Sequence, residues 1–312
     1  MRHLMSGIIA LGLMASCGAG SAQADAVRYF NLPAPQPILP DAQSWEGDQQ
    51  PHTLSVLKLN RGGFKYWGWY GLNNGRGTGL ARSNDLVHWT KYENNPLWLN
   101  ARWTSAFQDA ETGVLYFAIT RDYDTPSSRI VLATSRDGIH LTEVMTLVQK
   151  VPRERNQNPD LFRDPVSGRF FLLFYRGNDT DYFDIVARSA RRIEDLATAP
   201  DKLLLHTTET VAAPNLLYVP RGGPHGKGIY YLATEVYPNR YGKTQDGTWE
   251  VKVFHSERPD GDFEPVAGNP VQTGGRACLF QHIFGGKYYG YQSHLDPATD
   301  KWSMEALVLP LP

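Results

Sequence analysis

The sequence has little cysteine, almost no net charge and no long apolar run. Cys17 and Cys278 are the only cysteines in 312 residues. The net charge is −1 at pH 7, so no basic footprint favours a nucleic-acid partner. The main apolar run, residues 4–16, is too short to span a bilayer. We therefore expect neither nucleic acid nor a membrane span, and the sequence gives no oligomeric state.

The first 24 residues have the features of a signal peptide. Arg2 and His3 precede the apolar run, and residues 22–24 (AQA) form a small-x-small cleavage site. Residues 13–17 (LMASC) also resemble a lipobox, in which Cys17 would carry the lipid. We predict an exported protein, periplasmic or secreted, with a lipoprotein anchored through Cys17 as the alternative.

Residues 25–312 are predicted to form one domain without a disulfide, because Cys278 is its only cysteine. Cys278 itself is interpreted as a small buried hydrophobic residue. The domain is rich in aromatic residues, glycine and proline, with 16 Tyr, 13 Phe, 8 Trp, 29 Gly and 21 Pro in the whole chain. This composition is typical of many short strands joined by turns.

A hairpin at residues 156–175 shows the organising unit. Its turn, residues 164–168 (DPVSG), combines residues that favour tight turns, and residues 170–175 (FFLLFY) indicate a strand buried on both faces. Similar hairpins begin near residues 51, 103, 213 and 277, and a third strand follows them. A four-strand unit that recurs roughly every 50–65 residues is typical of a propeller blade.

The fifth unit lacks a fourth strand, and residues 27–32 (VRYFNL) are predicted to supply it. Closure of the ring would hide the open sheet edges. The predicted fold class is all-β, a five-bladed β-propeller whose last blade is closed by the N-terminal strand.

Polar residues stand at or near the start of the predicted first strands. These strands line the axis of a propeller, so the polar side chains should meet in one funnel, and such a ring of polar groups indicates a binding site. The predicted substrate-binding residues are Glu46, Gln50, His52, Arg102, Trp103, Arg155, Asn156, Asn158, Arg276 and His282.

Four segments resemble the blade motifs of five-bladed glycoside hydrolases of families 43, 32 and 130. They are residues 158–165 (NPDLFRDP), 83–89 (SNDLVHW), 213–218 (APNLLY) and 260–266 (DGDFEPV). The resemblance implies a propeller that acts on a carbohydrate. The family 43 pattern places three carboxylates at positions that here hold Gln50, Asn158 and Ala212. Residues 163–165 (RDP) resemble a family 32 motif but lie in the predicted hairpin turn, so a turn role is favoured.

Hydrolysis of a glycosidic bond needs a proton donor and a second carboxylate. The predicted catalytic residues are Asp48, Glu235 and Asp160. Each has a structural alternative: Asp48 caps a turn, Glu235 is an exposed strand end, and Asp160 pairs with Arg155 or Arg163.

The cationic candidates allow further alternatives. If two or three of Arg102, Arg155 and Arg276 meet in the funnel, an acidic sugar is favoured; otherwise each forms a structural ion pair. His52 and His282 would orient hydroxyls or donate protons, or would have structural roles. No metal-ligand spacing is recognisable, so no metal or cofactor is predicted, although an axial calcium or other ion stays open.

Three hypotheses follow. The first is an exported glycoside hydrolase, with a furanoside as one candidate substrate and with Asp48 and Glu235 in the leading acid/base roles. The second is a carbohydrate-active propeller of another reaction class, such as a lyase or phosphorylase. The third is a sugar-binding module without catalysis.

Overall fold

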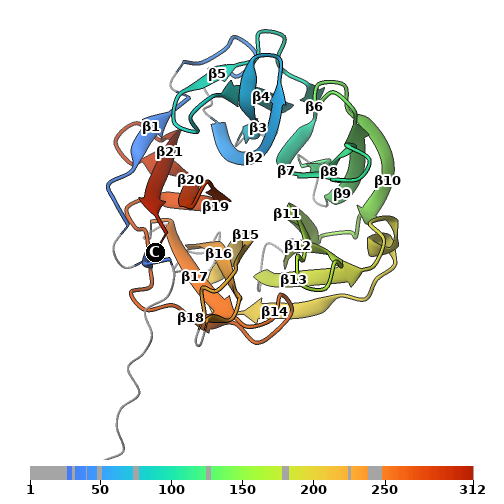
Figure 1. The fold of residues 1–312 in the computed structure, drawn as a ribbon, viewed down its shortest axis with the longest axis vertical. Helices are drawn as coiled ribbons and strands as arrows, with labels where there is room; N and C mark the ends of the chain where they lie inside the picture. The colour runs from blue at the N-terminus through green and yellow to red at the C-terminus, as the bar shows by residue number, and fades with distance from the viewer. Residues whose placement is uncertain are drawn as a thin grey trace, which may run out of the picture.

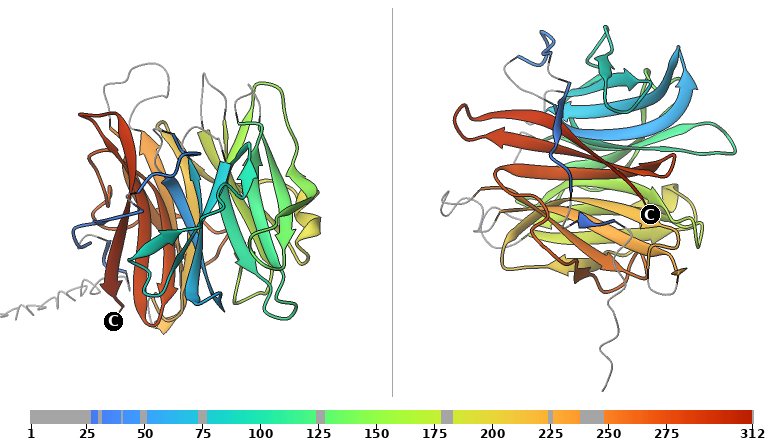
Figure 2. Two further views of the ribbon diagram at one scale, coloured as in Figure 1. Left: turned by 90° about the horizontal axis from the view of Figure 1, so that it is seen from above. Right: turned by 60° about the vertical axis from the view of Figure 1, so that its left-hand side comes forward.

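Five antiparallel sheets surround a common axis in the computed structural model of this chain (Figure 1). The structure describes residues 27–29, 32–39, 41–47, 51–72, 77–123, 128–177, 183–223, 226–237 and 248–311. Figure 2 shows the same sheets from the side, as tall twisted layers. The predicted all-β, five-bladed propeller is confirmed. None of the helices within the described ranges has the length and apolar character needed to cross a membrane.

The blades follow one another along the chain, and each begins with its innermost strand (Figure 1). Blade one contains β2 (Pro51–Arg61), β3 (Phe64–Leu72), β4 (Gly77–Ser83), β5 (Trp89–Lys91) and β6 (Trp98–Leu99), with β6 also paired to β4. Blade two contains β7 (Ala101–Gln108), β8 (Leu115–Arg121), β9 (Arg129–Ser135) and β10 (Thr142–Val148). Blade three contains β11 (Arg155–Arg163), β12 (Phe170–Gly177), β13 (Phe183–Ala190), the 3-10 helix η2 (Glu194–Ala197) and β14 (Lys202–His206).

Blade four contains β15 (Thr210–Val219), β16 (Ile229–Tyr237), β17 (Glu250–Ser256) and β18 (Glu264–Pro265). Blade five contains β19 (Arg276–Phe284), β20 (Lys287–Asp296), β21 (Lys301–Pro310) and, as its outer strand, β1 (Gln36–Ile38). The fifth repeat therefore supplies only three strands of its own blade, as predicted.

The N-terminal closure uses a different segment from the predicted one. Gln36 pairs with Ala306 and Ile38 with Met304 in an antiparallel ladder, so the prediction of residues 27–32 as the closing strand is wrong. Val27 and Tyr29 are buried instead in the apolar cluster between blades four and five. The error has a physical reason: valine and tyrosine favour strands and buried sites alike, whereas the true closing strand, QPI, carries little β propensity.

The core is distributed between neighbouring blades rather than gathered in one centre. Trp69 of blade one packs edge-on against Phe117 of blade two, with ring centroids 5.1 Å apart. Phe174 of blade three lies in one cluster with Leu132 of blade two. Each sheet is apolar on both faces because both faces contact a neighbour, which explains the unbroken apolar run at residues 170–175.

The turn chemistry of the 156–175 hairpin is confirmed. Asp164 accepts hydrogen bonds from the backbone N–H groups of Val166 (3.2 Å) and Ser167 (2.9 Å), and Gly168 has φ +70°. The hydroxyl of Tyr230 also donates to Asp164 (2.5 Å). Asp164 therefore organises a turn and its contact with blade four, as the turn interpretation of residues 163–165 predicted.

Candidate functional site

A β-bulge interrupts the first half of every inner strand at an equivalent position. The register shifts fall between Pro51 and Thr53, Arg102 and Thr104, Gln157 and Asp160, Ala212 and Asn215, and Ala277 and Phe280. The residues within these shifts include His52, Trp103, Asn158, Ala213 and Cys278, and the last four have φ between 46° and 52°. Left-handed backbone costs a non-glycine residue roughly 1–2 kcal/mol. Its recurrence indicates that the bulges are built into the fold, where they re-aim side chains.

Two side chains from the bulges, His52 and Cys278, meet Glu235 of β16, so that blades one, four and five come together. The Cys278 sulfur lies 3.2 Å from His52 Nε2 and donates its proton to Glu235 Oε2 at 2.9 Å. The His52 ring also stands edge-on to Trp302, at a centroid distance of 4.5 Å. All three side chains are buried. The prediction of Cys278 as a buried small residue is confirmed, but its polar partners could not be recognised from the residues around it in the chain.

Blades two and three add a cation and aromatic rings. The Arg102 guanidinium lies over the Trp103 ring at 3.5 Å and over Tyr123 at 4.0 Å from the ring centroids. Tyr175 donates its hydroxyl proton to Gln157 at 2.5 Å. We call the set His52, Arg102, Trp103, Asn158, Tyr175, Glu235 and Cys278 the axial site.

The pKa values of these groups show that they share one buried electrostatic environment. Burial raises the pKa of Glu235, while the Cys278 hydrogen bond and the charge of Arg102 partly oppose it. Burial and then Arg102 hold the pKa of His52 well below its usual value. Burial raises the pKa of Tyr175, against the charges of Arg155 and Arg102. The charge of Arg102 in blade two therefore lowers the pKa values of groups in blades one, three and four.

Several buried polar atoms of the axial site have no hydrogen-bond partner among the described residues. They are Nδ1 of His52, Nε1 of Trp103, and both polar atoms of the Asn158 amide. A buried polar group left unpaired costs free energy, so such groups are normally satisfied by water or a ligand. Donors and acceptors in this arrangement suit a polyhydroxylated ligand, and the Trp103 ring suits its apolar face.

The structure places two predicted site residues in structural pairs instead. Glu46 is fully buried, accepts the Tyr70 hydroxyl proton (2.7 Å) and pairs with Lys91 (2.8 Å) of the outer strand β5. Arg276 forms an ion pair with Glu305 at 2.9 Å. Neither residue is brought to the axial site, because each has found an opposite charge within or beside its own blade.

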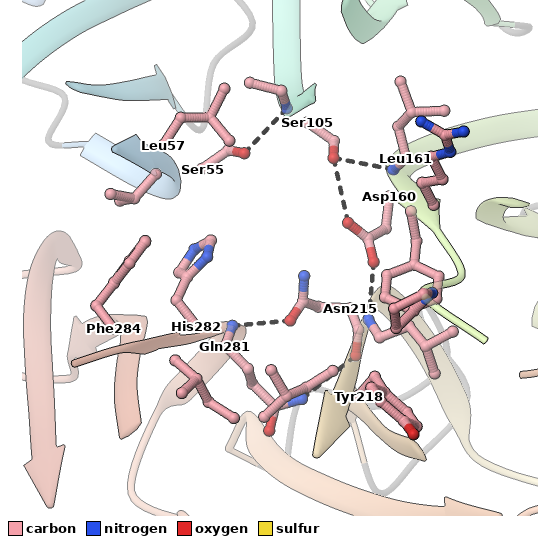
Figure 3. A pocket seen from close by; sticks show the side chains of 18 residues that line it. Ser55, Leu57, Ser105, Asp160, Leu161, Asn215, Tyr218, Gln281, His282 and Phe284 are labelled. Carbon is pink, nitrogen blue, oxygen red and sulfur yellow. Dashed lines mark hydrogen bonds between the residues drawn. The ribbon is translucent and has the colours of Figure 1, made fainter. Parts of the chain in front are cut away.

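Asp160 belongs to a second ring, which joins neighbouring inner strands. In each of blades one to four, one side chain of the inner strand accepts a hydrogen bond from a backbone N–H of the next blade. The pairs are Ser55 with Ala106 (3.0 Å), Ser105 with Leu161 (2.9 Å), Asp160 with Leu216 (2.7 Å) and Asn215 with Gln281 (2.7 Å). Figure 3 shows these bonds around a cavity of about 380 Å³. We call these four acceptors the inter-blade ring.

His282 lines the same cavity and bonds to the backbone of Leu54, which links blade five to blade one. The inter-blade ring and the cavity lie further along the inner strands than the bulges. The structure therefore does not bring Asp160 and His282 into the axial site.

Of the remaining predicted site residues, Asn156 and Arg155 lie at the start of β11. Asn156 is buried and its amide donates to Glu154 at 3.0 Å, while Arg155 acts on Tyr175 from the start of β11. Asp48 and Gln50 lie outside the described residues. Sequence reasoning missed Tyr123 and Tyr175 as well as the polar role of Cys278. The end of the aromatic run 170–175 was the only available signal for Tyr175.

A metal ion has a candidate location within the axial site. One ligand atom each of His52, Glu235 and Cys278 lie within 4.8 Å of one another. These residues are far apart in the sequence, so spacing could not reveal them.

The fold and the axial site together define a class: a five-bladed propeller with a buried polar cluster where its inner strands begin. No protein-family model matches the sequence, and no curated protein is significantly similar to it. Several solved structures are similar to this chain in fold. A thermostable family-43 glycoside hydrolase has 15% identity and a TM-score of 0.64, over 85% of this chain and 91% of that chain.

Two further structures show the breadth of the class. An exo-1,5-α-L-arabinanase from a bovine ruminal metagenomic library has 14% identity and a TM-score of 0.59, over 86% of this chain and 95% of that chain. An N-acetylgalactosamine deacetylase from F. plautii, in complex with blood group B trisaccharide, has 13% identity and a TM-score of 0.63, over 86% and 92%. At these identities the likeness establishes the fold, and the predicted resemblance in fold to family 43 structures is confirmed.

Proposed function

We propose that this protein is an exported glycoside hydrolase that acts on a poly- or oligosaccharide at the axial site. Support comes from carbohydrate-active proteins with the same fold and from the buried, polar and aromatic character of the site. The sequence features of residues 1–24 support export.

One observation carries the proposal. Glu235 of β16 pairs directly opposite Ala212 of β15. Ala212 occupies the position at which the family 43 pattern has the glutamate that serves as the general acid. Residues directly opposite in an antiparallel pair have Cβ atoms about 4.5–5.5 Å apart, on the same face of the sheet. A carboxyl group is therefore present beside the substituted position, supplied by the neighbouring strand.

In the proposed reaction Glu235 donates a proton to the leaving glycosidic oxygen. Asp48 is the proposed second carboxylate, which activates water or attacks the anomeric carbon; it lies two residues before Gln50, another substituted position. Trp103 and Asn158 are proposed to contact the sugar ring and its hydroxyls. Asp160, predicted as a third catalytic carboxylate, is left out, because its oxygens already accept hydrogen bonds in the inter-blade ring.

A second function is favoured by a specific observation: the three positions of the family 43 carboxylates hold Gln50, Asn158 and Ala212. A propeller that binds a sugar without cleaving it needs none of them. This alternative keeps the sugar contacts of Trp103 and Asn158 and removes the acid role of Glu235.

The test is a hydrolysis and binding screen on arabinan, xylan and N-acetylated oligosaccharides with the wild type and Glu235→Gln. Hydrolysis should fall by roughly 10²–10⁴-fold, the usual contribution of a general acid, while sugar binding is retained. Glu209→Gln is the matched control, because Glu209 belongs to the same blade and pairs with Lys252 at 2.6 Å, outside the axial site. Undiminished hydrolysis by Glu235→Gln would contradict the acid role, and binding without hydrolysis in the wild type would favour the second function.

A further inference from the structure

We propose that His52, Glu235 and Cys278 form a binding site for one thiophilic divalent cation, with Zn²⁺ as the best-suited ion. The inference concerns metal binding and goes beyond the proposed glycan hydrolysis. It starts from the meeting of three different ligand types from three different blades at one point.

The distances suit a small tetrahedral ion. Zn–S, Zn–N and Zn–O bonds of about 2.0–2.3 Å separate ligand atoms by about 3.3–3.8 Å at a tetrahedral centre. The Cys278 sulfur lies 3.2 Å from His52 Nε2 and 2.9 Å from Glu235 Oε2, and all three ligand atoms fall within 4.8 Å. The two sulfur contacts would lengthen by about 0.4–0.7 Å as this hydrogen-bonded cluster became a coordination sphere.

The ligand types select the ion. Thiolate and imidazole favour Zn²⁺ and similar transition metals, whereas Ca²⁺ and Mg²⁺ require several oxygen ligands. Three protein ligands leave a fourth position for water, as in open zinc sites. The sequence-based alternative of an axial calcium ion therefore finds poor support at this cluster.

The charges balance when the ion binds. Zn²⁺ displaces the proton of the Cys278 thiol, so the thiolate and the Glu235 carboxylate together neutralise the two positive charges. His52 would coordinate as a neutral imidazole, which adds no charge to the complex. The nearby Arg102 then faces a neutral complex rather than an additional cation.

The backbone holds the ligands in place. Cys278 sits at the bulge of β19 with φ 50°, and Glu235 is fixed in β16 between Ala212 and Val251. Ligands on strands of a packed fold are already ordered before binding, which reduces the entropic cost of forming the site.

The experiment is titration of the untagged protein with Zn²⁺ by calorimetry, followed by replacement with Co²⁺. We expect one equivalent of Zn²⁺ per chain and, for Co²⁺, the near-ultraviolet absorption band of a cobalt–thiolate bond. Cys278→Ser should weaken Zn²⁺ binding by roughly 100-fold or more, since even loss of an outer-shell partner costs about 10–100-fold. Glu209→Gln is the matched control, because Glu209 belongs to the same blade as Glu235 but pairs with Lys252 outside the axial site, and this variant should bind Zn²⁺ like the wild type.

The cobalt spectrum of the wild type reports the sulfur ligand directly, so the test does not depend on the folding of Cys278→Ser. Absence of Zn²⁺ binding, a Co²⁺ complex without the thiolate band, or equal weakening of Zn²⁺ binding in Glu209→Gln and Cys278→Ser would overturn the proposal. None of these measurements uses hydrolysis, so the metal site and the proposed function fail or hold separately.

Discussion

Replacement of Asp160 by asparagine should change how the stability of the propeller depends on pH. Asp160 is buried, and burial raises its pKa to about 6 despite hydrogen bonds from Leu216 N–H (2.7 Å) and Ser105 Oγ–H (3.1 Å). The folded protein therefore holds this proton more tightly than the unfolded chain, whose aspartates titrate near 3.8. The stabilisation from the protonated Asp160 side chain is complete only below about pH 3, under the unfolded-state pKa, and is lost as the pH rises through 6.

The magnitude follows from the shift. A difference of about two pKa units corresponds to about 3 kcal/mol of unfolding free energy over the whole titration, of which about 2 kcal/mol is lost between pH 4 and pH 7. Asparagine keeps one oxygen for Leu216 N–H and offers an amide N–H to the Ser105 oxygen, so the inter-blade ring persists without a titrating group. Relative to the wild type, the unfolding free energy of Asp160→Asn should thus rise by about 2 kcal/mol as the pH rises from 4 to 7.

The assay is urea-induced unfolding of both proteins at several pH values, read by tryptophan fluorescence. Asp109→Asn provides a control of opposite sign: backbone and side-chain hydrogen bonds from Thr112 lower the pKa of Asp109, so its stabilising effect is present at high pH and lost on acidification. A stability difference between Asp160→Asn and the wild type that stays constant from pH 4 to 7 would refute the reasoning.

Three further predictions concern the axial site and the ring closure. Ala212→Glu introduced into an inactive Glu235→Ala protein should restore part of the glycan hydrolysis, because residues 212 and 235 are directly opposed in the sheet. The measurement is the initial rate on the best substrate of the screen. A double variant whose rate does not exceed that of Glu235→Ala would contradict a relocated acid. Stoichiometric Zn²⁺ should inhibit hydrolysis and a chelator should reverse it, since a metal-bound Glu235 cannot donate a proton; activity that requires Zn²⁺ would contradict the acid role. Ile38→Ala should lower the free energy of unfolding in urea by about 2–5 kcal/mol, because Ile38 is a buried residue of the closing strand. An unchanged urea midpoint would show that this strand is dispensable.

The fold could be predicted from the sequence because each blade repeats the same local chemistry. Turn residues such as those of 164–168 and two-sided apolar strands such as 170–175 recur five times, and local signals of this kind survive in any tertiary context. The closing strand could not be identified in the same way. Gln36–Ile38 has no distinctive pattern, and its pairing with β21 is decided by the geometry of the ring.

The candidate site was only partly predictable. Polar residues at the starts of inner strands were visible, but the sequence does not show which of them pair with neighbours within or beside their own blade, as Glu46 does with Lys91. The left-handed bulges at Trp103 and Cys278 are equally hidden, because nothing in those residue types demands positive φ. The meeting of His52 with Cys278, 226 positions apart, depends entirely on ring closure.

We propose that a sugar binds where the inner strands begin, among side chains contributed by all five blades. The most direct measurement is a crystal structure of Glu235→Gln soaked with an oligosaccharide that the wild type hydrolyses. We expect a sugar ring in contact with Trp103 and Asn158, with its glycosidic oxygen beside residue 235. Sugar found only in the cavity next to the inter-blade ring, or on the outer surface of the blades, would contradict it.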